Sequence, residues 1–232
     1  MSGAKGVEAK VEAATARHLF VSNVEPFWTN VERRAKDLGF FGAWKERRRM
    51  KRLLVEVARL LALQDVRAGA WDQKKGEVVC SFKIDRQGVL HDLREFAAKL
   101  EDKSYVSIVE GNQKSSFPHL MQSKERFAYY IPVEFPEPLW VSLDPNTDPI
   151  PVGSSVKLES ELESLNEHLR VEETFKLKKM VDFFAASDKD IAKFESTADM
   201  QGGHFWVKFG YVLIRKLAHK SVEHSLPIVF GT

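Results

Sequence analysis

The chain has 232 residues, of which 44% are hydrophobic and 29% are charged. These proportions are ordinary for a soluble globular protein, so they exclude a wholly disordered chain, a collagen-like repeat and a bundle of membrane helices. The formal net charge is only +2, and this balance points to no class of partner. A chain of this length can bury a substantial core and corresponds to one large domain or to one and a half small ones.

The cysteine content and the apolar runs predict a cytoplasmic protein. Cys80 is the single cysteine, so no intramolecular disulfide can form, and a lone thiol fits a reducing compartment. The first 16 residues lack the apolar core of a secretory signal. The most apolar run, 53–63, contains Glu56 and Arg59 and is too short to span a bilayer. We therefore expect no membrane association.

The first elements in chain order are a tail and two helices. We expect residues 1–25 to be a flexible or frayed N-terminal segment. Residues 26–64 have helical patterning, and Gly39 with Gly42 predicts a break between two helices. In the second helix, apolar residues recur at helical spacing and form one stripe. These residues are Met50, Leu53, Leu54, Val57, Leu60 and Leu61.

The middle of the chain predicts strands around one helix. Apolar and polar residues alternate with period two over 78–84, which indicates a strand, and a helical pattern follows over 85–101. Three further strands are predicted at 105–109, 127–135 and 139–143. The segment from 110 to 126 joins two of these strands and is long for a hairpin connection.

The C-terminal half is predicted to be helical and to end in a strand. Helices are expected from residue 152 onward, over 172–186, from Ser187, and over 205–222. The last of these is mostly apolar through its first half, so it should be packed on most sides. Residues 226–230 are strand formers that follow this buried helix, and we expect them in the interior of the sheet.

The order of these elements predicts the α+β class, with helices packed on a mixed β-sheet. We expect residues 26–232 to form a single α+β domain. Its N-terminal region is helical, and its helical C-terminal half ends in a final strand.

Known metal and nucleophile motifs are absent from the sequence. The seven histidines lack the spacing of a helical zinc site, and one cysteine cannot form a thiolate cluster. The stretch that begins at Asp144 starts like a calcium loop, but Pro149 and Ser155 occupy the positions of the required glycine and glutamate. We therefore expect no metal and no cofactor, and we find no catalytic signature.

The 110–126 loop is the best candidate for a small-molecule site. Long loops between strands are often functional. The candidate residues there are Lys114, Ser115 and His119, of which the histidine titrates near the pH range useful for proton transfer. The loop supports the hypothesis of a small-molecule enzyme, although the sequence places no partner acid beside His119.

Charge is strongly uneven along the chain. Residues 31–52 contain nine basic and three acidic residues, a net +6, whereas residues 134–173 contain ten acidic and two basic residues, a net −8. The basic segment has three interpretations. It could bind nucleic acid with an aromatic ring stacked on a base, it could pair with the acidic 134–173 segment within one chain or across a dimer, or it could be a solvated face. The candidate anion- or partner-binding residues are Trp44, Arg47, Arg48, Arg49, Lys51 and Arg52.

The favoured function is a non-catalytic, cytoplasmic protein-interaction or binding module. It could be adaptor-like or toxin-neutralising, and its charged surfaces would contact a protein partner. The first alternative is a nucleic-acid-binding protein that uses the basic helix 45–52. The second alternative is the enzyme at the 110–126 loop.

Overall fold

The computed structural model describes residues 20–36, 38–67, 76–84, 89–122, 128–171 and 205–230. Its centre is a mixed six-stranded sheet in the order β2-β1-β6-β3-β5-β4. Strands β3 and β5 run parallel, and every other neighbouring pair is antiparallel. The strands are β1 Phe20–Val24, β2 Cys80–Ile84, β3 Tyr129–Ile131, β4 Leu139–Val141, β5 Ile150–Ser154 and β6 Ile228–Phe230.

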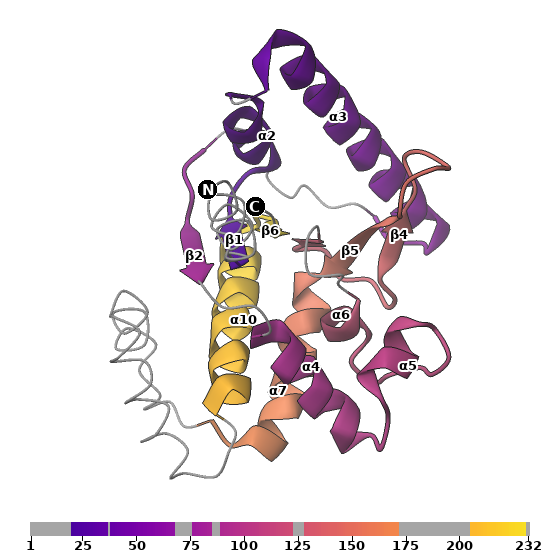
Figure 1. Ribbon diagram of the computed structural model, residues 1–232, viewed down its shortest axis with the longest axis vertical. Helices are drawn as coiled ribbons and strands as arrows, with labels where there is room; N and C mark the ends of the chain where they lie inside the picture. Colours follow the sequence, from indigo (N-terminus) through magenta and orange to yellow (C-terminus); the bar gives the residue numbers. More distant parts are fainter. Residues whose placement is uncertain are drawn as a thin grey trace, which may run out of the picture.

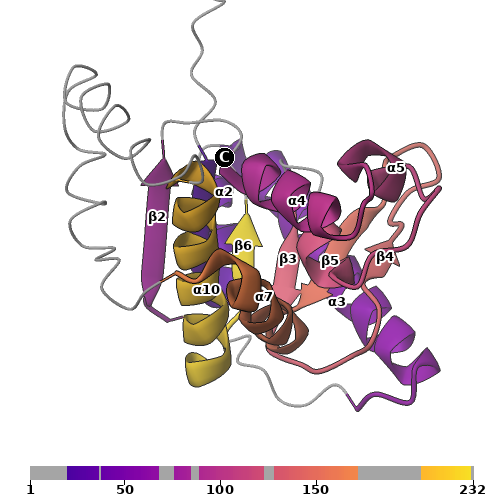
Figure 2. The ribbon, with the colours of Figure 1, turned by 90° about the horizontal axis from the view of Figure 1, so that it is seen from below.

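Helices cover both faces of this sheet, so the predicted α+β class is confirmed (Figure 1). The first two described helices, α2 and α3, lie on one face of the sheet. Helices α4, α7 and α10 lie on the other face, where Figure 2 shows them in front of the strands. The helices are α2 Phe27–Lys36, α3 Gly39–Leu63, α4 Val89–Leu100, α5 Tyr105–Val109, α6 Pro118–Met121, α7 Ser155–Leu169 and α10 Phe205–His224.

The sheet separates two apolar cores because side chains alternate between its faces. In β3, Tyr129 and Ile131 pack toward α2 and α3, whereas Tyr130 packs toward α4, α7 and α10. In β6, Val229 belongs to the core beneath α2 and α3, and Ile228 belongs to the core beneath α4, α7 and α10. Strand β6 lies between β1 and β3, so the prediction that the last strand enters the sheet interior is confirmed.

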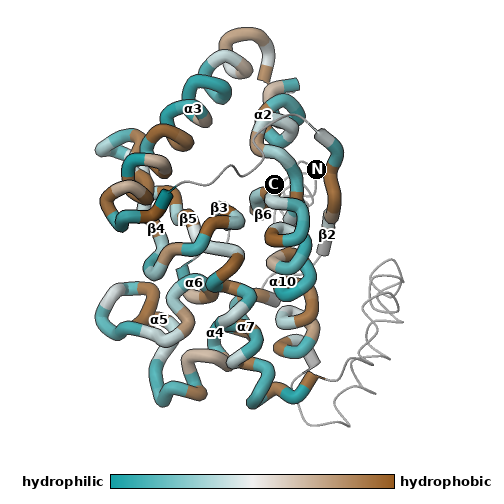
Figure 3. The backbone as a smooth tube through the Cα atoms, turned by 180° about the vertical axis from the view of Figure 1, so that it is seen from behind, coloured by the Kyte–Doolittle hydropathy of each residue, from teal (hydrophilic) through white to brown (hydrophobic). Residues whose placement is uncertain are grey.

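The predicted pair of N-terminal helices is confirmed. Helix α2 ends at Lys36, and α3 begins at Gly39, whose φ of 64° favours glycine and permits the sharp change of direction. Four residues of the predicted stripe are buried against the sheet. Figure 3 shows the corresponding alternation of hydrophilic and hydrophobic residues along α3. Burial of this stripe positions the basic residues of α3 toward solvent.

Two strands were missed by the sequence analysis. Strand β1 lies within the N-terminal segment 1–25, yet it pairs with both β2 and β6. Strand β5 lies where the chain was expected to become helical. All five of its residues are buried, so the polar alternation of a half-exposed strand is missing. Gly153 is required here because a Cβ would lie 2.6 Å from the Tyr130 ring.

The predicted strand over 105–109 is wrong, because these residues form helix α5. Its β-branched residues have no neighbouring strand, and Val106 and Val109 are 57% and 44% exposed. Strand propensity depends on packing against such a neighbour, so local helical hydrogen bonds prevail. The helices predicted over 172–186 and from Ser187 lie outside the described residues. Among the described helices, none is long and apolar enough to cross a membrane.

Candidate protein-binding surface

Two residues of the basic run of α3, Arg47 and Arg49, pair with carboxylates of α2 and α3 themselves. The Arg47 guanidinium donates two hydrogen bonds to Glu32, of 3.1 and 2.9 Å. Glu46 lies 3.4 Å from Arg34 and 3.8 Å from Arg49. In the described part of the chain, these side chains form no ion pair with the acidic 134–173 segment. Within one chain, the described residues thus show pairing between adjacent helices, and pairing of the two segments across a dimer stays a prediction.

The other candidate residues of α3 face a shallow cavity beside the end of β4. Arg48, Lys51 and Arg52 line this cavity, whose volume is about 380 Å³. Arg52 donates a long hydrogen bond of 3.4 Å to the carbonyl oxygen of Leu143, and the Arg48 guanidinium lies 5.4 Å from the centre of the Trp44 ring. The structure thus brings four of the six predicted residues to one side of α3.

His119 is a buried cross-link between α6 and the sheet. Its Nδ1 accepts a 3.0 Å hydrogen bond from the backbone N–H of Ser154, and its Nε2 lies 3.3 Å from the carbonyl oxygen of Pro136. This arrangement requires a neutral ring with the proton on Nε2. Burial lowers the pKa of His119 to about 4. Because both ring nitrogens have backbone partners, neither is available to transfer a proton to a ligand in this arrangement.

Glu161 of α7 holds the beginning of α6 from the opposite side. Its two carboxylate oxygens accept hydrogen bonds from the backbone N–H groups of His119 and Leu120, at 3.0 and 2.8 Å. Burial raises the pKa of Glu161 to about 8, even though both hydrogen bonds favour the charged form. His119 and Glu161 both line a cavity of about 410 Å³. Their hydrogen bonds hold α6 between α7 and the sheet.

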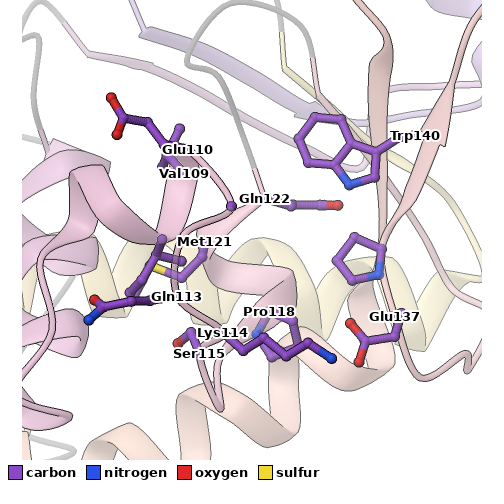
Figure 4. Close-up of a pocket in the computed structure, with 13 residues that line it drawn as sticks. Val109, Glu110, Gln113, Lys114, Ser115, Pro118, Met121, Gln122, Glu137 and Trp140 are labelled. Atoms are coloured by element: carbon purple, nitrogen blue, oxygen red, sulfur yellow. The ribbon is translucent and has the colours of Figure 1, made fainter.

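The other two predicted loop residues, Lys114 and Ser115, line a different cavity of about 460 Å³. Figure 4 shows Trp140 and Glu137 on the side opposite Gln113 and Glu110. The Ser115 hydroxyl donates a 2.7 Å hydrogen bond to Glu101, so it is already occupied. His119 is absent from the lining of this cavity. The three loop candidates therefore do not form one site.

Helix α7 carries a row of carboxylates from the acidic segment. Glu159, Glu163 and Glu167 are four residues apart and share one side of the helix. Glu159 lies 3.1 Å from His219 of α10, whereas Glu163 and Glu167 are exposed and form no ion pair with described residues. At 1.5 Å of rise per residue, successive carboxylates are about 6 Å apart along the helix axis.

Fold and charge together define an α+β protein with a basic layer and an acidic helix on opposite faces of one sheet. The family model described as "Putative DNA-mimic protein" matches residues 45–230. The match covers most of the chain, and the chain belongs to this family. No curated protein and no solved structure matches the chain.

This family corrects the favoured function. The expectation of an adaptor-like or toxin-neutralising module is wrong on this finding, because the family that the chain belongs to is described as putative DNA-mimic proteins. The two alternatives, nucleic-acid binding by helix 45–52 and an enzyme at the 110–126 loop, are likewise not what the family describes. The coarser expectation of a protein partner agrees with the family, which gives no direct support for a nucleic-acid partner.

Several residues of the cavity shown in Figure 4 were not singled out from the sequence. Gln122 and Trp140 lie on different elements, 18 positions apart, and only the fold brings them to one cavity. Their spacing matches no motif. One clue was present: Trp140 is the outward-facing residue of a strand whose neighbours Leu139 and Val141 are buried, so an aromatic ring stands at a position open to solvent.

Proposed function

We propose that this protein binds a DNA-binding protein by presenting, on α7 and the segment before it, a substitute for the charges of a DNA strand. The observation that carries the proposal is the family match over residues 45–230. The acidic segment 134–173, with its net −8, is the part of the chain that can supply such charges. Among its described members, the row on α7 is the most regular.

The spacing of the α7 carboxylates supports this proposal. Phosphates of one DNA strand advance by about 3.4 Å along the helix axis. Glu163 and Glu167 are separated by about 6 Å of helical rise, which is close to two phosphate steps. Arginine and lysine side chains arranged to contact alternate phosphates could therefore reach both carboxylates.

The net charge of +2 does not oppose this proposal, because the mimicry is local. The basic residues of α3 lie on one face of the sheet, and α7 packs on the other. At physiological ionic strength, exposed charges are screened over about 8 Å. Arg47 and Arg49 also have carboxylate partners on their own side of the sheet. A partner at α7 would therefore contact the carboxylates of that helix without also contacting the basic residues of α3.

The test is capture of partners on the immobilised full chain from a nuclease-treated extract of the source organism. Bound proteins are then eluted with duplex DNA and identified by mass spectrometry. We expect DNA-binding proteins to be captured and to be released by the duplex. Capture should be lost in the double variant Glu163→Lys, Glu167→Lys.

The matched control is the double variant Glu77→Lys, Glu95→Lys. It makes the same change in net charge at exposed or partly exposed positions outside the acidic segment. This control should capture the same proteins as the unaltered chain. The proposal fails if the captured proteins do not bind DNA, if duplex DNA does not displace them, or if both double variants lose capture equally.

A further inference from the structure

The cavity of about 460 Å³ between the α5–α6 connection and β4 has the size of a small-ligand site. Its walls combine apolar side chains with a few polar groups. Figure 4 shows the Trp140 ring at one side and the carboxylates of Glu110 and Glu137 at separate edges. Trp140 is 49% exposed, although the strand residues on either side of it are buried.

Gln122 contributes to this cavity a buried amide oxygen without a partner among the described residues. The residue is 5% exposed. Its amide nitrogen faces the Tyr130 hydroxyl, and this contact acts against the burial that raises the pKa of that group. A Cβ at Gly153 would collide with the amide nitrogen, so the nitrogen end packs directly on the backbone of β5. Figure 4 shows the amide extending toward the Trp140 side with its oxygen foremost.

This arrangement favours a ligand that donates hydrogen bonds. An unpaired buried acceptor costs free energy, which a donor placed in the cavity would recover. Glu137 adds a carboxylate that forms no hydrogen bond or ion pair with described residues. An exposed indole ring favours a cation over its face. A guanidinium group combines these properties, since it is planar, positively charged and carries five N–H donors and no acceptor.

We propose that this cavity binds an arginine side chain of the DNA-binding partner. The guanidinium would lie against the Trp140 ring, donate to the Gln122 amide oxygen and pair with the Glu137 carboxylate. The inference rests on the proposed function, and it adds a specific contact to it. DNA offers a comparable site, because a narrow minor groove attracts inserted arginine through its negative potential.

Lys114 makes the proposal sharply testable. Its ammonium group lines the same cavity and extends toward Glu137 in Figure 4. A bound guanidinium would be repelled by Lys114 and would compete with it for the carboxylate. Removal of this charge should therefore strengthen the binding of a cation, whereas it would weaken the binding of an anion.

The test is a titration of the full chain, labelled with ¹⁵N, with the blocked tripeptide acetyl-Gly-Arg-Gly-amide. The indole N–H resonance of Trp140 is assigned with Trp140→Phe and reports on the cavity. We expect a saturable shift in the millimolar range. The matching lysine tripeptide should bind at least about threefold more weakly, because an ammonium group lacks the planar fork of donors.

Three variants separate a binding role from a structural one. Glu137→Gln and Gln122→Met should each weaken binding of the arginine tripeptide at least about threefold, and Lys114→Ala should strengthen it about twofold. Gln122→Met should leave the urea midpoint of unfolding close to that of the unaltered chain, because the loss of the donor beside Tyr130 is offset by removal of an unpaired buried oxygen. A clearly lower midpoint would show that the Gln122 oxygen has a structural partner and would overturn the proposal.

Absence of a saturable shift would also overturn the inference, as would equal binding of the two tripeptides or weaker binding in Lys114→Ala. These outcomes are independent of the capture experiment. If DNA-binding proteins are captured equally well by Glu137→Gln, the proposed function stands and this contact fails. If the arginine tripeptide binds as described and no DNA-binding protein is captured, the cavity stands and the proposed function fails.

Discussion

Replacement of Glu161 by glutamine should change how the stability of the protein depends on pH. The carboxyl has a pKa of 4.5 in the unfolded chain and of about 8 in the folded protein, where burial raises it. Between these values, the folded state holds a proton that the unfolded chain releases. Its contribution to stability is therefore complete below pH 4.5 and is lost as the pH rises through 8, at about 1.4 kcal/mol per pH unit.

His119 contributes with the opposite sign. Its pKa is 6.5 in the unfolded chain and about 4 in the folded protein, again because of burial. Its contribution is present above pH 6.5 and is lost as the pH falls through 4. The two effects oppose each other where they overlap. Between pH 6.5 and 8 the effect of Glu161 exceeds that of His119, so the pair predicts a net loss of about 1 kcal/mol in the free energy of unfolding.

The measurement is urea denaturation followed by circular dichroism at closely spaced pH values between 4 and 8. In Glu161→Gln the decline above pH 6.5 should disappear. Below pH 6.5 the uncompensated histidine should lower stability by about 1.4 kcal/mol for each unit of acidification. Glutamine also loses one of the two acceptor contacts to α6, but that cost does not depend on pH.

Glu163→Gln is the matched control, because it removes an exposed carboxylate from the same helix. It should retain the decline of the unaltered protein between pH 6.5 and 8. If Glu161→Gln retains that decline as well, burial does not hold a proton on Glu161, and the reasoning about this pair is wrong.

Three further substitutions test contacts that hold the fold. Ser154→Ala removes the hydroxyl that caps α7 and should lower the free energy of unfolding by about 1 kcal/mol in urea titrations. Glu25→Gln weakens a fully buried carboxylate contact with Arg33 and should cost about 2 kcal/mol, measured by guanidinium denaturation. Gly153→Ala places a methyl group against Gln122 and should cost about 1–3 kcal/mol, with a lower thermal midpoint in calorimetry.

The elements predicted correctly are those whose side chains distinguish a buried side from an exposed one. Helix α3 has a single apolar stripe on a polar background, so its period is visible in the sequence. Strand β6 was found through its dense strand formers after a buried helix. Strand β5 has no exposed side, and Pro151 and Gly153 conceal it further, because both residues are rare inside sheets.

The candidate site was less predictable, because its contacts join distant parts of the chain. The sequence identified the uneven charge but not its pairing, since the partners of Arg47 and Arg49 depend on how α2 packs against α3. His119 was selected for its ordinary pKa, which burial then changes. Neither the burial of His119 nor the unpaired amide oxygen of Gln122 can be inferred from residue type and spacing alone.

The proposed mimicry also predicts how binding depends on salt. Duplex DNA has about one charge per 1.7 Å of axis and releases condensed counterions when a protein binds. The row on α7 offers one carboxylate per about 6 Å, and such sparse charges condense few counterions. The captured partner should therefore lose affinity for this protein less steeply than for duplex DNA between 50 and 200 mM salt, a range over which DNA complexes weaken strongly. Fluorescence anisotropy with both ligands measures the two slopes. If the affinity for this protein falls with salt as steeply as the affinity for DNA, many more charges take part than α7 provides. The proposal that the mimicry is confined to α7 and the segment before it would then be wrong.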